Sequence, residues 1–384
     1  MIIEINSIIL LPMKIRVLQE DLSKALTTTS RFASPKVQLP VLANMLLKSV
    51  GNKLYIAATN LEMSVSLPIG AKVEKEGEIT VPTRTIVDLI NNLKPGPVEI
   101  EDEKEKVKIK SQGFDSSVSG INSSDFPKIP SVLEKTDFKL NSGQLVEALA
   151  KVLFSVSTDE TRPVLTGVLV IFDIEKLILV STDGFRLSQK TIKIETNKKE
   201  LKVILPKNVL HELLRTMGES DSVEFSYSKN DNQMLFGLGG IVLTSRIING
   251  EFPDFEKIIP KKSTWTFVTD KDELLRAVKL ASVFARDSAN LVKLKMKKDS
   301  IEVFAESSQY GSQSTNIDSK IISDEDISKD FVIGFNYRFL EDFLNSCKSD
   351  DVEIGVSDPN SSAVFLDPKD KDYLHIIMPV RMQS

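Results

Sequence analysis

The sequence is poor in the residues that most often carry chemistry: it has one cysteine and two histidines among 384 residues. The lone Cys347 excludes an internal disulfide framework and suits a reducing compartment. Neither His211 nor His375 lies in a recognisable nucleophile motif with a serine or cysteine. No apolar run approaches the roughly 20 residues that span a bilayer, and residues 1–12 have no basic segment typical of a signal peptide. We therefore expect a cytoplasmic protein without a membrane span.

Positive charge is not in excess either, since 49 Lys and Arg stand against 54 Asp and Glu and give a net charge of −5. This balance argues against a protein that coats nucleic acid uniformly. It leaves room for a local basic surface, because the distribution of charge matters more than its sum.

What the sequence does contain is internal repetition. Residues 40–44, Pro-Val-Leu-Ala-Asn, return as Pro-Val-Leu-Thr-Gly 123 positions later, at 163–167. Other segments return in the same order: 53–62 as 176–185, 81–84 as 205–208, and 125–127 as 251–253. A third and more diverged copy fills the remaining chain, so a unit of about 125 residues is present three times. We expect domains at 1–132 (with 1–12 as an N-terminal extension), 133–260 and 261–384.

Each copy has the pattern of an α+β module. A short strand precedes an amphipathic helix whose apolar residues recur at helical spacing: Leu22, Ala25, Leu26 and Thr29; Leu145, Val146, Leu149, Val152 and Leu153; Leu274, Leu275, Val278, Ala281 and Phe284. Second helices are predicted at 85–93, 209–217 and 337–347, two of them just after a proline. Alternating runs such as 168–172, 177–181, 107–110, 223–227 and 352–356 predict antiparallel strands. The fold class is therefore two helices packed on antiparallel sheets, three times over.

Candidate catalytic patterns are weak. Residues 237–240, Gly-Leu-Gly-Gly, lack the lysine and the strand-loop-helix context of a phosphate-binding loop, so we predict a hairpin turn there. Asp159, Glu160 and Asp183 could be read as a metal or acid–base site, which would make the protein a metal-dependent enzyme. No further ligands follow at fixed spacing, and acidic turn residues explain them better. We expect no enzyme, no cofactor and no metal.

Basic residues on the apolar-striped helices suggest a different function. A single basic helix is usually just a solvated face, but here the arrangement recurs on six predicted helices. If these helices line one concave surface, they form a stripe suited to DNA phosphates. The residues expected to face DNA are Lys24, Arg31, Arg84, Lys151, Lys207, Arg215, Arg276, Lys279 and Arg338, with Lys36 and Arg162 near the acidic turn 157–162. A structural repeat protein without a role on DNA is the other alternative.

The order and spacing of several motifs resemble the bacterial sliding clamp family, the beta subunit of DNA polymerase III, from Met13 onward. The matching segments are 39–44, 59–63, 181–187, 250–255, 333–337 and 376–381. The resemblance implies three clamp-fold domains and a head-to-tail homodimer that forms a six-domain ring around duplex DNA. Such a ring tethers the replicative polymerase and confers processivity without covalent chemistry.

The resemblance also implies two protein-binding surfaces. Partners insert a short motif between the second and third domains, at Leu165, Thr182, Gly184, Phe185, Arg186, Leu187, Pro253, Ile258, Phe339, Ser362, Ile376, Ile377, Met378, Pro379, Val380, Arg381 and Met382. The dimer interface would use Val283 and Phe284 against Val118. The partners implied are double-stranded DNA, the polymerase alpha subunit, the clamp loader delta subunit, translesion polymerases, ligase and mismatch-repair proteins.

Overall fold

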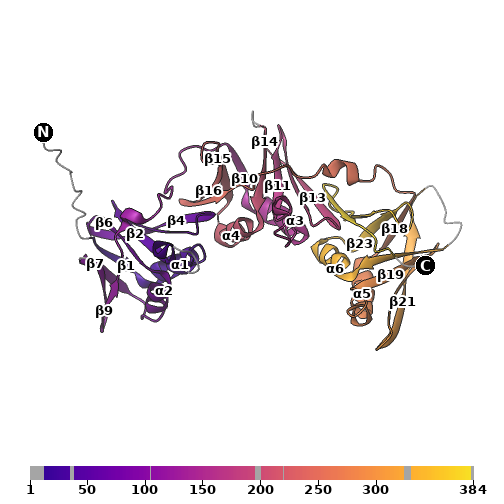
Figure 1. Ribbon diagram of the computed structural model, residues 1–384, viewed down its shortest axis with the longest axis horizontal. Coiled ribbons are helices and arrows are strands. Elements are labelled where there is room, and N and C mark those ends of the chain that lie inside the picture. The colour runs from indigo at the N-terminus through magenta and orange to yellow at the C-terminus, as the bar shows by residue number, and fades with distance from the viewer. Residues whose placement is uncertain are drawn as a thin grey trace. The chain divides into compact units, whose positions relative to one another are not determined.

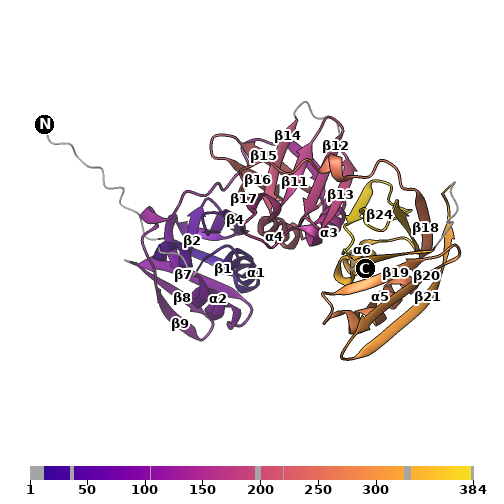
Figure 2. The same cartoon turned by 45° about the vertical axis from the view of Figure 1, so that its right-hand side comes forward.

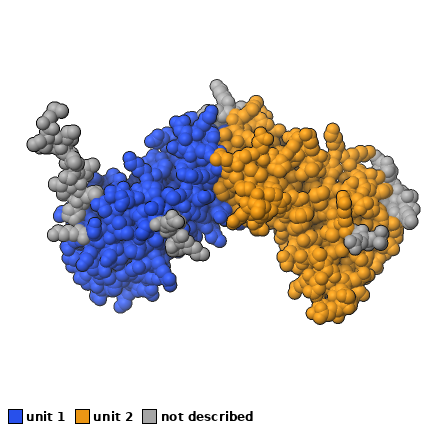
Figure 3. Space-filling view, viewed as in Figure 1, with its two compact units in different colours: residues 1–142, 208–247 blue, residues 143–207, 248–384 orange. Residues whose placement is uncertain are grey.

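The computed structural model describes residues 13–34, 39–103, 105–194, 200–218, 220–323 and 330–381. The expected N-terminal extension, Lys36 and Met382 lie outside these described residues. The chain forms two compact units, one of residues 1–142 and 208–247 and the other of residues 143–207 and 248–384 (Figure 3). The second repeat therefore contributes to both units. None of the described helices is long and apolar enough to cross a membrane.

The first repeat begins with a strand and a helix, as predicted, and continues through five strands to a second helix and three final strands. Its elements are β1 Lys14–Leu18, α1 Gln19–Ser30, β2 Asn44–Val50, β3 Lys53–Thr59, β4 Met63–Gly70, β5 Lys72–Lys75, β6 Gly77–Pro82, α2 Thr83–Asn91, β7 Pro97–Glu103, β8 Lys106–Ser111 and β9 Phe114–Ser119, with short 3-10 turns at Pro40–Ala43 and Ser123–Asp125.

The second and third repeats have the same order without the short strand β5. The second contains β10 Phe138–Asn141, α3 Ser142–Val152, β11 Gly167–Phe172, β12 Lys176–Thr182, β13 Arg186–Lys193, β14 Leu201–Pro206, α4 Lys207–Met217, β15 Ser222–Ser228, β16 Gln233–Leu238 and β17 Ile241–Arg246, with 3-10 turns at Leu153–Ser155 and Pro163–Leu165. After a further 3-10 turn, η5 (Phe255–Ile258), the third contains β18 Trp265–Asp270, α5 Lys271–Ala285, β19 Leu291–Met296, β20 Ser300–Ser307, β21 Gly311–Ile321, β22 Phe331–Asn336, α6 Tyr337–Ser346, β23 Asp351–Val356, β24 Ala363–Leu366 and β25 Tyr373–Ile377.

The helices form where the apolar spacing predicts them, and their apolar faces pack on the sheets. The predicted stripe of α1 is entirely buried, whereas Val146 on α3 is 43 % exposed, so its inclusion in the inward stripe was wrong. Helix α2 begins at Thr83, two residues before the predicted start, because Pro82 occupies the N-cap and not a position before it. Helix α1 packs against α2, and α5 packs against α6 (Figures 1 and 2).

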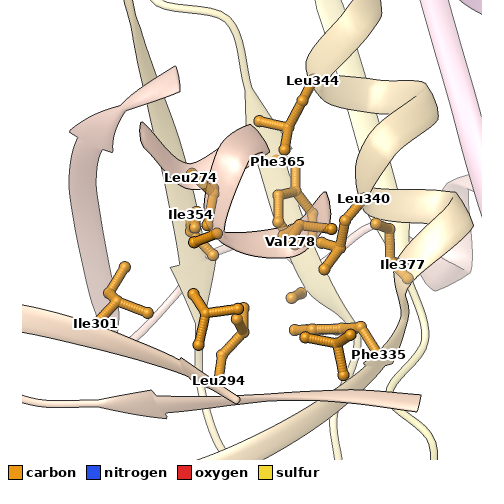
Figure 4. Close-up of a cluster of buried hydrophobic side chains, with 14 of the residues drawn as sticks. Leu274, Val278, Leu294, Ile301, Phe335, Leu340, Leu344, Ile354, Phe365 and Ile377 are labelled. Carbon is orange, nitrogen blue, oxygen red and sulfur yellow. The ribbon is translucent and has the colours of Figure 1, made fainter. Parts of the chain in front are cut away.

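The hydrophobic core of the third repeat illustrates this packing. Leu274 and Val278 on α5 and Leu340 and Leu344 on α6 point toward side chains from the surrounding strands, among them Phe335 (Figure 4). All five are at most 1 % exposed. Burying a side chain of this size contributes about 1.5–3 kcal/mol, so the two helices hold the sheets together chiefly through this apolar contact.

The sheets are antiparallel and continue from one repeat into the next. In the first unit β17 pairs with β4, a contact that we call the first joint. In the second unit β25 pairs with β13, which we call the second joint. In each joint the fourth strand of one repeat pairs with the last strand of the next repeat. These pairs are β4 with β17 and β13 with β25. Within the described residues the resulting sheets have 8 and 12 strands, and a further sheet has 5.

The predicted turn in the glycine-rich segment is also present. Gly239 and Gly240 join β16 to β17 with φ angles of +57° and +102°. Two consecutive left-handed residues make the tight hairpin that glycine adopts at little cost. The prediction of a hairpin turn is confirmed.

Candidate functional site

The turn between β12 and β13 lies at the start of the second joint and contains several residues of the expected partner site. The Thr182 hydroxyl donates to the Arg186 carbonyl at 2.6 Å and accepts from the Gly184 amide at 3.0 Å. The Asp183 carboxylate accepts from the amides of Phe185 and Arg186 at 2.9 and 3.0 Å. Gly184 has a φ of +94°, which favours glycine. These bonds fix the direction in which Phe185 leaves the turn.

The first repeat builds the same turn with different side chains. Thr59 bonds to the Met63 carbonyl and the Leu61 amide, each at 3.0 Å. Asn60 accepts from the amides of Glu62 and Met63 at 3.0 and 2.8 Å. Leu61, at the position of Gly184, is left-handed with a φ of +73°. The repetition read from the sequence therefore extends to individual hydrogen bonds.

An apolar surface surrounds the turn of the second joint. Its floor is a buried cluster that includes Leu165, Leu187 and Ile376, none of them more than 5 % exposed. Phe252 and Phe255 pack in the same cluster, and Phe255 is the first residue of η5. Large apolar side chains remain uncovered around this floor: Phe185, Ile258 and Met378 are 61 %, 52 % and 51 % exposed. The Met378 amide donates to the Phe185 carbonyl at 2.8 Å, so these two lie side by side.

Arg186 connects this surface to the third repeat. Its guanidinium donates to Asp183 at 3.1 Å, to Asp342 on α6 at 2.5 Å and to the Phe154 carbonyl at 2.6 Å. It also lies 4.4 Å from the ring centroid of Phe339. With its donors engaged in this way, Arg186 supports the surface from below. Sequence reasoning placed Arg186 in the site but missed Asp342 and Phe154, which lie far from it in the chain.

The remaining residues expected in the partner site differ in exposure. Gly184, Pro253 and Arg381 are exposed, and Phe339, Ser362, Pro379 and Val380 are half-buried. Thr182 is buried within the turn. Ile377 is fully buried in the core of the third repeat and cannot touch a partner, so its assignment to the site was wrong. The reason is strand alternation, because neighbours Ile376 and Ile377 point to opposite faces of β25.

The basic residues expected to face DNA are mostly exposed on their helices. Lys24, Arg84, Arg215, Arg276, Lys279 and Arg338 are exposed, as is Arg162 in its loop, and Arg31 and Lys207 are half-buried. Lys151 is the exception: it is 2 % exposed and paired with Asp370, so the expectation that it faces DNA was wrong. Its side chain reaches inward from α3 to a carboxylate 219 positions away in the chain, a contact that the helical pattern does not reveal.

Several of these basic residues are already paired. Glu212 on α4 lies 2.5 Å from Arg31 and 2.8 Å from Arg215, both within the first unit. Arg162 donates to Asp159 at 2.8 Å. Burial lowers the pKa of Lys207, and the nearby Arg186 charge lowers it further.

Two of the three acidic residues considered for a metal site, Asp159 and Asp183, have other roles. Asp159 accepts hydrogen bonds from Thr161 and Arg162, which hold the pKa of its carboxyl below the ordinary value. Asp183 holds the turn described above. Within the described ranges, no group of three or more His, Cys, Asp or Glu could hold a metal ion.

The residues expected at a dimer interface differ in exposure. Val283 on α5 is 56 % exposed and Phe284 is half-buried. Val118 is 6 % exposed, because its side chain points into its own repeat, so an apolar contact from Val118 across an interface was a wrong expectation. What β9 offers is its backbone edge, which pairs with no further strand among the described residues.

Family models for DNA polymerase III beta subunits match three successive parts of the chain. The N-terminal domain model covers residues 13–130, the central domain model 139–254 and the C-terminal domain model 256–381. A beta sliding clamp from Synechocystis is 28 % identical over 96 % of this chain and 100 % of its own length.

Solved structures give the same result. The DNA polymerase III beta subunit of Thermotoga maritima is 25 % identical, covers 97 % of this chain and 100 % of its own, and superposes with a TM-score of 0.87. A sliding clamp from Bacillus subtilis, 23 % identical, covers the same shares with a TM-score of 0.90 and supports the fold. The chain belongs to the family of DNA polymerase III beta subunits, the beta sliding clamps.

Proposed function

We propose that the protein is a processivity clamp: two copies close head to tail into a ring of six clamp domains around duplex DNA and tether the replicative polymerase. Members of this family are non-catalytic processivity subunits of DNA polymerase III. The observation that carries the ring is the pairing rule of the two joints. The fourth strands β4 and β13 pair with the last strands β17 and β25. Among the described residues, the fourth strand of the third repeat, β21, and the last strand of the first repeat, β9, have no such partner.

The rule also supplies a register for the missing joint. Ser64 pairs with Thr244 in the first joint, and their equivalents Leu187 and Ile376 pair in the second. The hairpin registers place Ser312 of β21 at the position of Ser64, and Ser117 of β9 at the position of Thr244. We therefore expect Ser312 of one copy to lie opposite Ser117 of the other. Both serines are exposed.

A disulfide tests this register. The Cα atoms of facing antiparallel residues lie about 4.5–5.5 Å apart, within the range that a disulfide bridges. Ser117→Cys with Ser312→Cys should therefore form a covalent dimer in high yield under oxidation. Each single variant is a matched control and should stay monomeric on a denaturing gel, since the native Cys347 is buried. A double variant that never cross-links, or a mass equal to one chain in light scattering, would exclude the head-to-tail ring.

Topology on DNA is the second test. The double cysteine variant is mixed with circular duplex DNA under reducing conditions and is then oxidised. A closed ring should stay on the circle at about 1 M salt, where phosphate contacts are screened, and should leave when the DNA is linearised. Release from the intact circle at high salt would mean that binding is electrostatic and that the DNA is not encircled.

The basic residues on the helices would hold the DNA loosely enough to slide. Charge reversal at Arg84, Lys207 and Arg276 together should weaken association with DNA and lower its dependence on salt. These residues lie on α2, α4 and α5, one in each repeat. An unchanged salt slope would remove them from the DNA-facing set.

Domain boundaries at 1–132, 133–260 and 261–384 are part of the same proposal.

The apolar surface of the second joint is the proposed partner site. Exposed Phe185, Ile258 and Met378 over a floor of Leu165, Leu187 and Ile376 suit a short peptide with Leu and Phe anchors. Met378 adapts its packing to different side chains, which fits partners as varied as the polymerase alpha subunit, clamp loader delta subunit, translesion polymerases, ligase and mismatch-repair proteins.

Fluorescence anisotropy with a labelled ten-residue peptide that ends in Leu-Phe measures this binding. Phe185→Ala with Met378→Ala should weaken it, since both side chains are exposed and their loss leaves the core intact. Leu61→Ala, in the equivalent turn of the first joint, is the matched control and should bind as the wild type does. Equal affinity in all three proteins would place the partner site elsewhere.

A further inference from the structure

A buried cluster of two lysines and two aspartates lies behind the second joint. Lys151 on α3 and Lys190 on β13 both donate to the Asp370 carboxylate, the latter at 2.5 Å. The Lys151 ammonium also lies 3.7 Å from Asp367 and 4.6 Å from the ring centroid of Tyr373. The side chains of Lys151 and Asp367 are 2 % and 0 % exposed. Two positive and two negative charges balance in this space.

The cluster is fully hydrogen-bonded on its acidic side. The Ser349 hydroxyl and the amides of Lys348 and Lys369 donate to Asp367, the two amides at 2.9 and 3.1 Å. Burial alone would raise the pKa values of both aspartates, but these bonds and the lysines hold them below their ordinary value. A buried charge whose partner is removed is left uncompensated, so each member depends on the others.

The cluster joins the second repeat to the third at one end of the β13–β25 ladder. Lys151 and Lys190 belong to the second repeat, and Asp367 and Asp370 belong to the turn that leads into β25. Lys190 pairs with Tyr373, the first residue of β25. The Tyr373 amide donates to the Asp370 carbonyl at 3.0 Å, so the turn and the strand are held together.

The proposed partner site lies at the other end of the same ladder, where Arg186 pairs with Ile377. A shift of one residue in this register would exchange the faces of Ile376 and His375. It would place an imidazole in the apolar floor and would move Met378 away from Phe185. The partner site therefore depends on the register of the β13–β25 ladder, and the ion cluster at the opposite end of the ladder can fix that register.

We propose that Lys151 is a positioning residue for the partner site: by bridging Asp367 and Asp370 it fixes β25 in register on β13 and so presents Ile376 and Met378 to a peptide. This inference rests on the proposed partner site. Lys151 does not touch the peptide itself.

The first joint has no such cluster among the described residues. The repeat places Leu67 at the position of Lys190, and the two-residue turn Gly239–Gly240 at the position of the loop that carries Asp367 and Asp370. The cluster is thus a feature of the joint that bears the apolar surface.

The test is Lys151→Met in the full-length dimer, with the labelled Leu-Phe peptide as the probe. We expect the dissociation constant to rise about tenfold or more, which corresponds to a loss of about 1.4 kcal/mol in binding free energy. Hydrogen exchange of the Met378 amide, which reports on the second joint, should quicken. Exchange of the Arg246 amide, bonded to the Glu62 carbonyl in the first joint, should not change.

Lys348→Met is the matched control. Lys348 forms an ion pair with Glu147 at 2.8 Å between the same two repeats, but its side chain is 63 % exposed. An exposed pair contributes little, so this variant should bind the peptide as the wild type does. If it weakens binding as much as Lys151→Met, the effect is not specific to the buried cluster and the proposal fails.

A second variant keeps the test decisive if Lys151→Met does not fold. Lys151→Met with Asp370→Asn removes one charge of each sign, keeps an acceptor for Lys190 and leaves the cluster neutral. It should form the dimer and still bind the peptide more weakly. Wild-type affinity in either folded variant would overturn the role of Lys151 while leaving the partner site intact. A wild-type protein that does not bind the peptide would instead overturn the partner site, and this inference with it.

Discussion

The two joints share one backbone arrangement but place their apolar and polar side chains on opposite faces of the sheet. In the first joint the ladder residues that face the helices are Val65, Leu67 and Leu243, and those on the opposite face are Ser64, Ser66 and Thr244. In the second joint the helix-facing residues are Ser188, Lys190 and His375, and the opposite face carries Leu187 and Ile376. The strand pairing is therefore the same in both joints, whereas the faces that carry the apolar and the polar side chains are exchanged.

This exchange explains why one joint is suited to an apolar peptide and the other is not. The opposite face of the first joint contains a hydroxyl pair, Ser64 and Thr244, 2.5 Å apart. Toward the other end of this ladder, at the β16–β17 turn, lies a hollow of about 440 Å³ lined in part by Lys53, Glu224 and the glycines of that turn. At the second joint the same face is the hydrophobic floor beneath Phe185 and Met378. Side chains, and not the backbone, decide where a partner can bind.

The largest expected effect comes from placing the charge of one joint in the other. Leu67→Lys puts an ammonium at a position that is 9 % exposed, without the aspartates that accompany Lys190. We expect the first joint to lose about 3–5 kcal/mol, the cost of an uncompensated buried charge. Amide exchange of Arg246, which reports on this joint, measures the change.

The reverse substitution sharpens the result. Lys190→Leu should cost the second joint less, about 1–3 kcal/mol, because Lys151 still pairs with Asp370. If the two substitutions cost the same, the ion cluster does not distinguish the joints.

The next effect is a dependence on pH confined to the second joint. Burial, with a smaller contribution from the Arg186 charge, lowers the pKa of His375 to about 3, so the ring stays neutral in the folded protein. Below about pH 6.5 the unfolded chain binds a proton that the folded one does not, and stability falls as the pH falls. At about 1.4 kcal/mol per pH unit, the second joint should lose about 2 kcal/mol by pH 5.

Exchange of the Met378 amide between pH 7 and pH 5, corrected for the intrinsic rate, tests this dependence. The first joint has Leu243 at the equivalent position and should show no matching change. His375→Leu should remove the pH dependence from the second joint. A His375→Leu protein that keeps the full dependence would assign it to another group.

The helices, most strands and the three-fold repetition follow from the sequence, because apolar spacing decides them locally. The stripe of α1, the start of α6 at Tyr337 and the glycine hairpin are examples. The repetition also indicates which strands are equivalent, but not which strands pair between repeats.

The contents of the joints could not be predicted, because they depend on partners distant in sequence. Lys151 resembles any basic helix residue until its neighbours Asp367 and Asp370, more than two hundred positions away, are known. One signal was available: Lys190 occupies an inward position of an alternating strand where the first repeat has Leu67. Val118 and Ile377 were misplaced for a related reason, since a strand residue can lie beside a functional edge while its side chain points into the core.

The smallest effect concerns the two equivalent turns and should have opposite signs in the two joints. Leu61 holds a left-handed conformation that costs a leucine about 1–2 kcal/mol, while its exposed side chain gains little from packing. Leu61→Gly should therefore stabilise the first joint by about 0.5–1 kcal/mol after the extra entropy of glycine is counted. Gly184→Ala should destabilise the second joint, because φ is +94° and the new Cβ would lie 3.0 Å from the Arg162 guanidinium. Amide exchange of Arg246 and Met378 measures both changes. If Leu61→Gly weakens the first joint, the leucine side chain has a contact there that offsets its strain, and the two turns would share their hydrogen bonds without sharing their energetics.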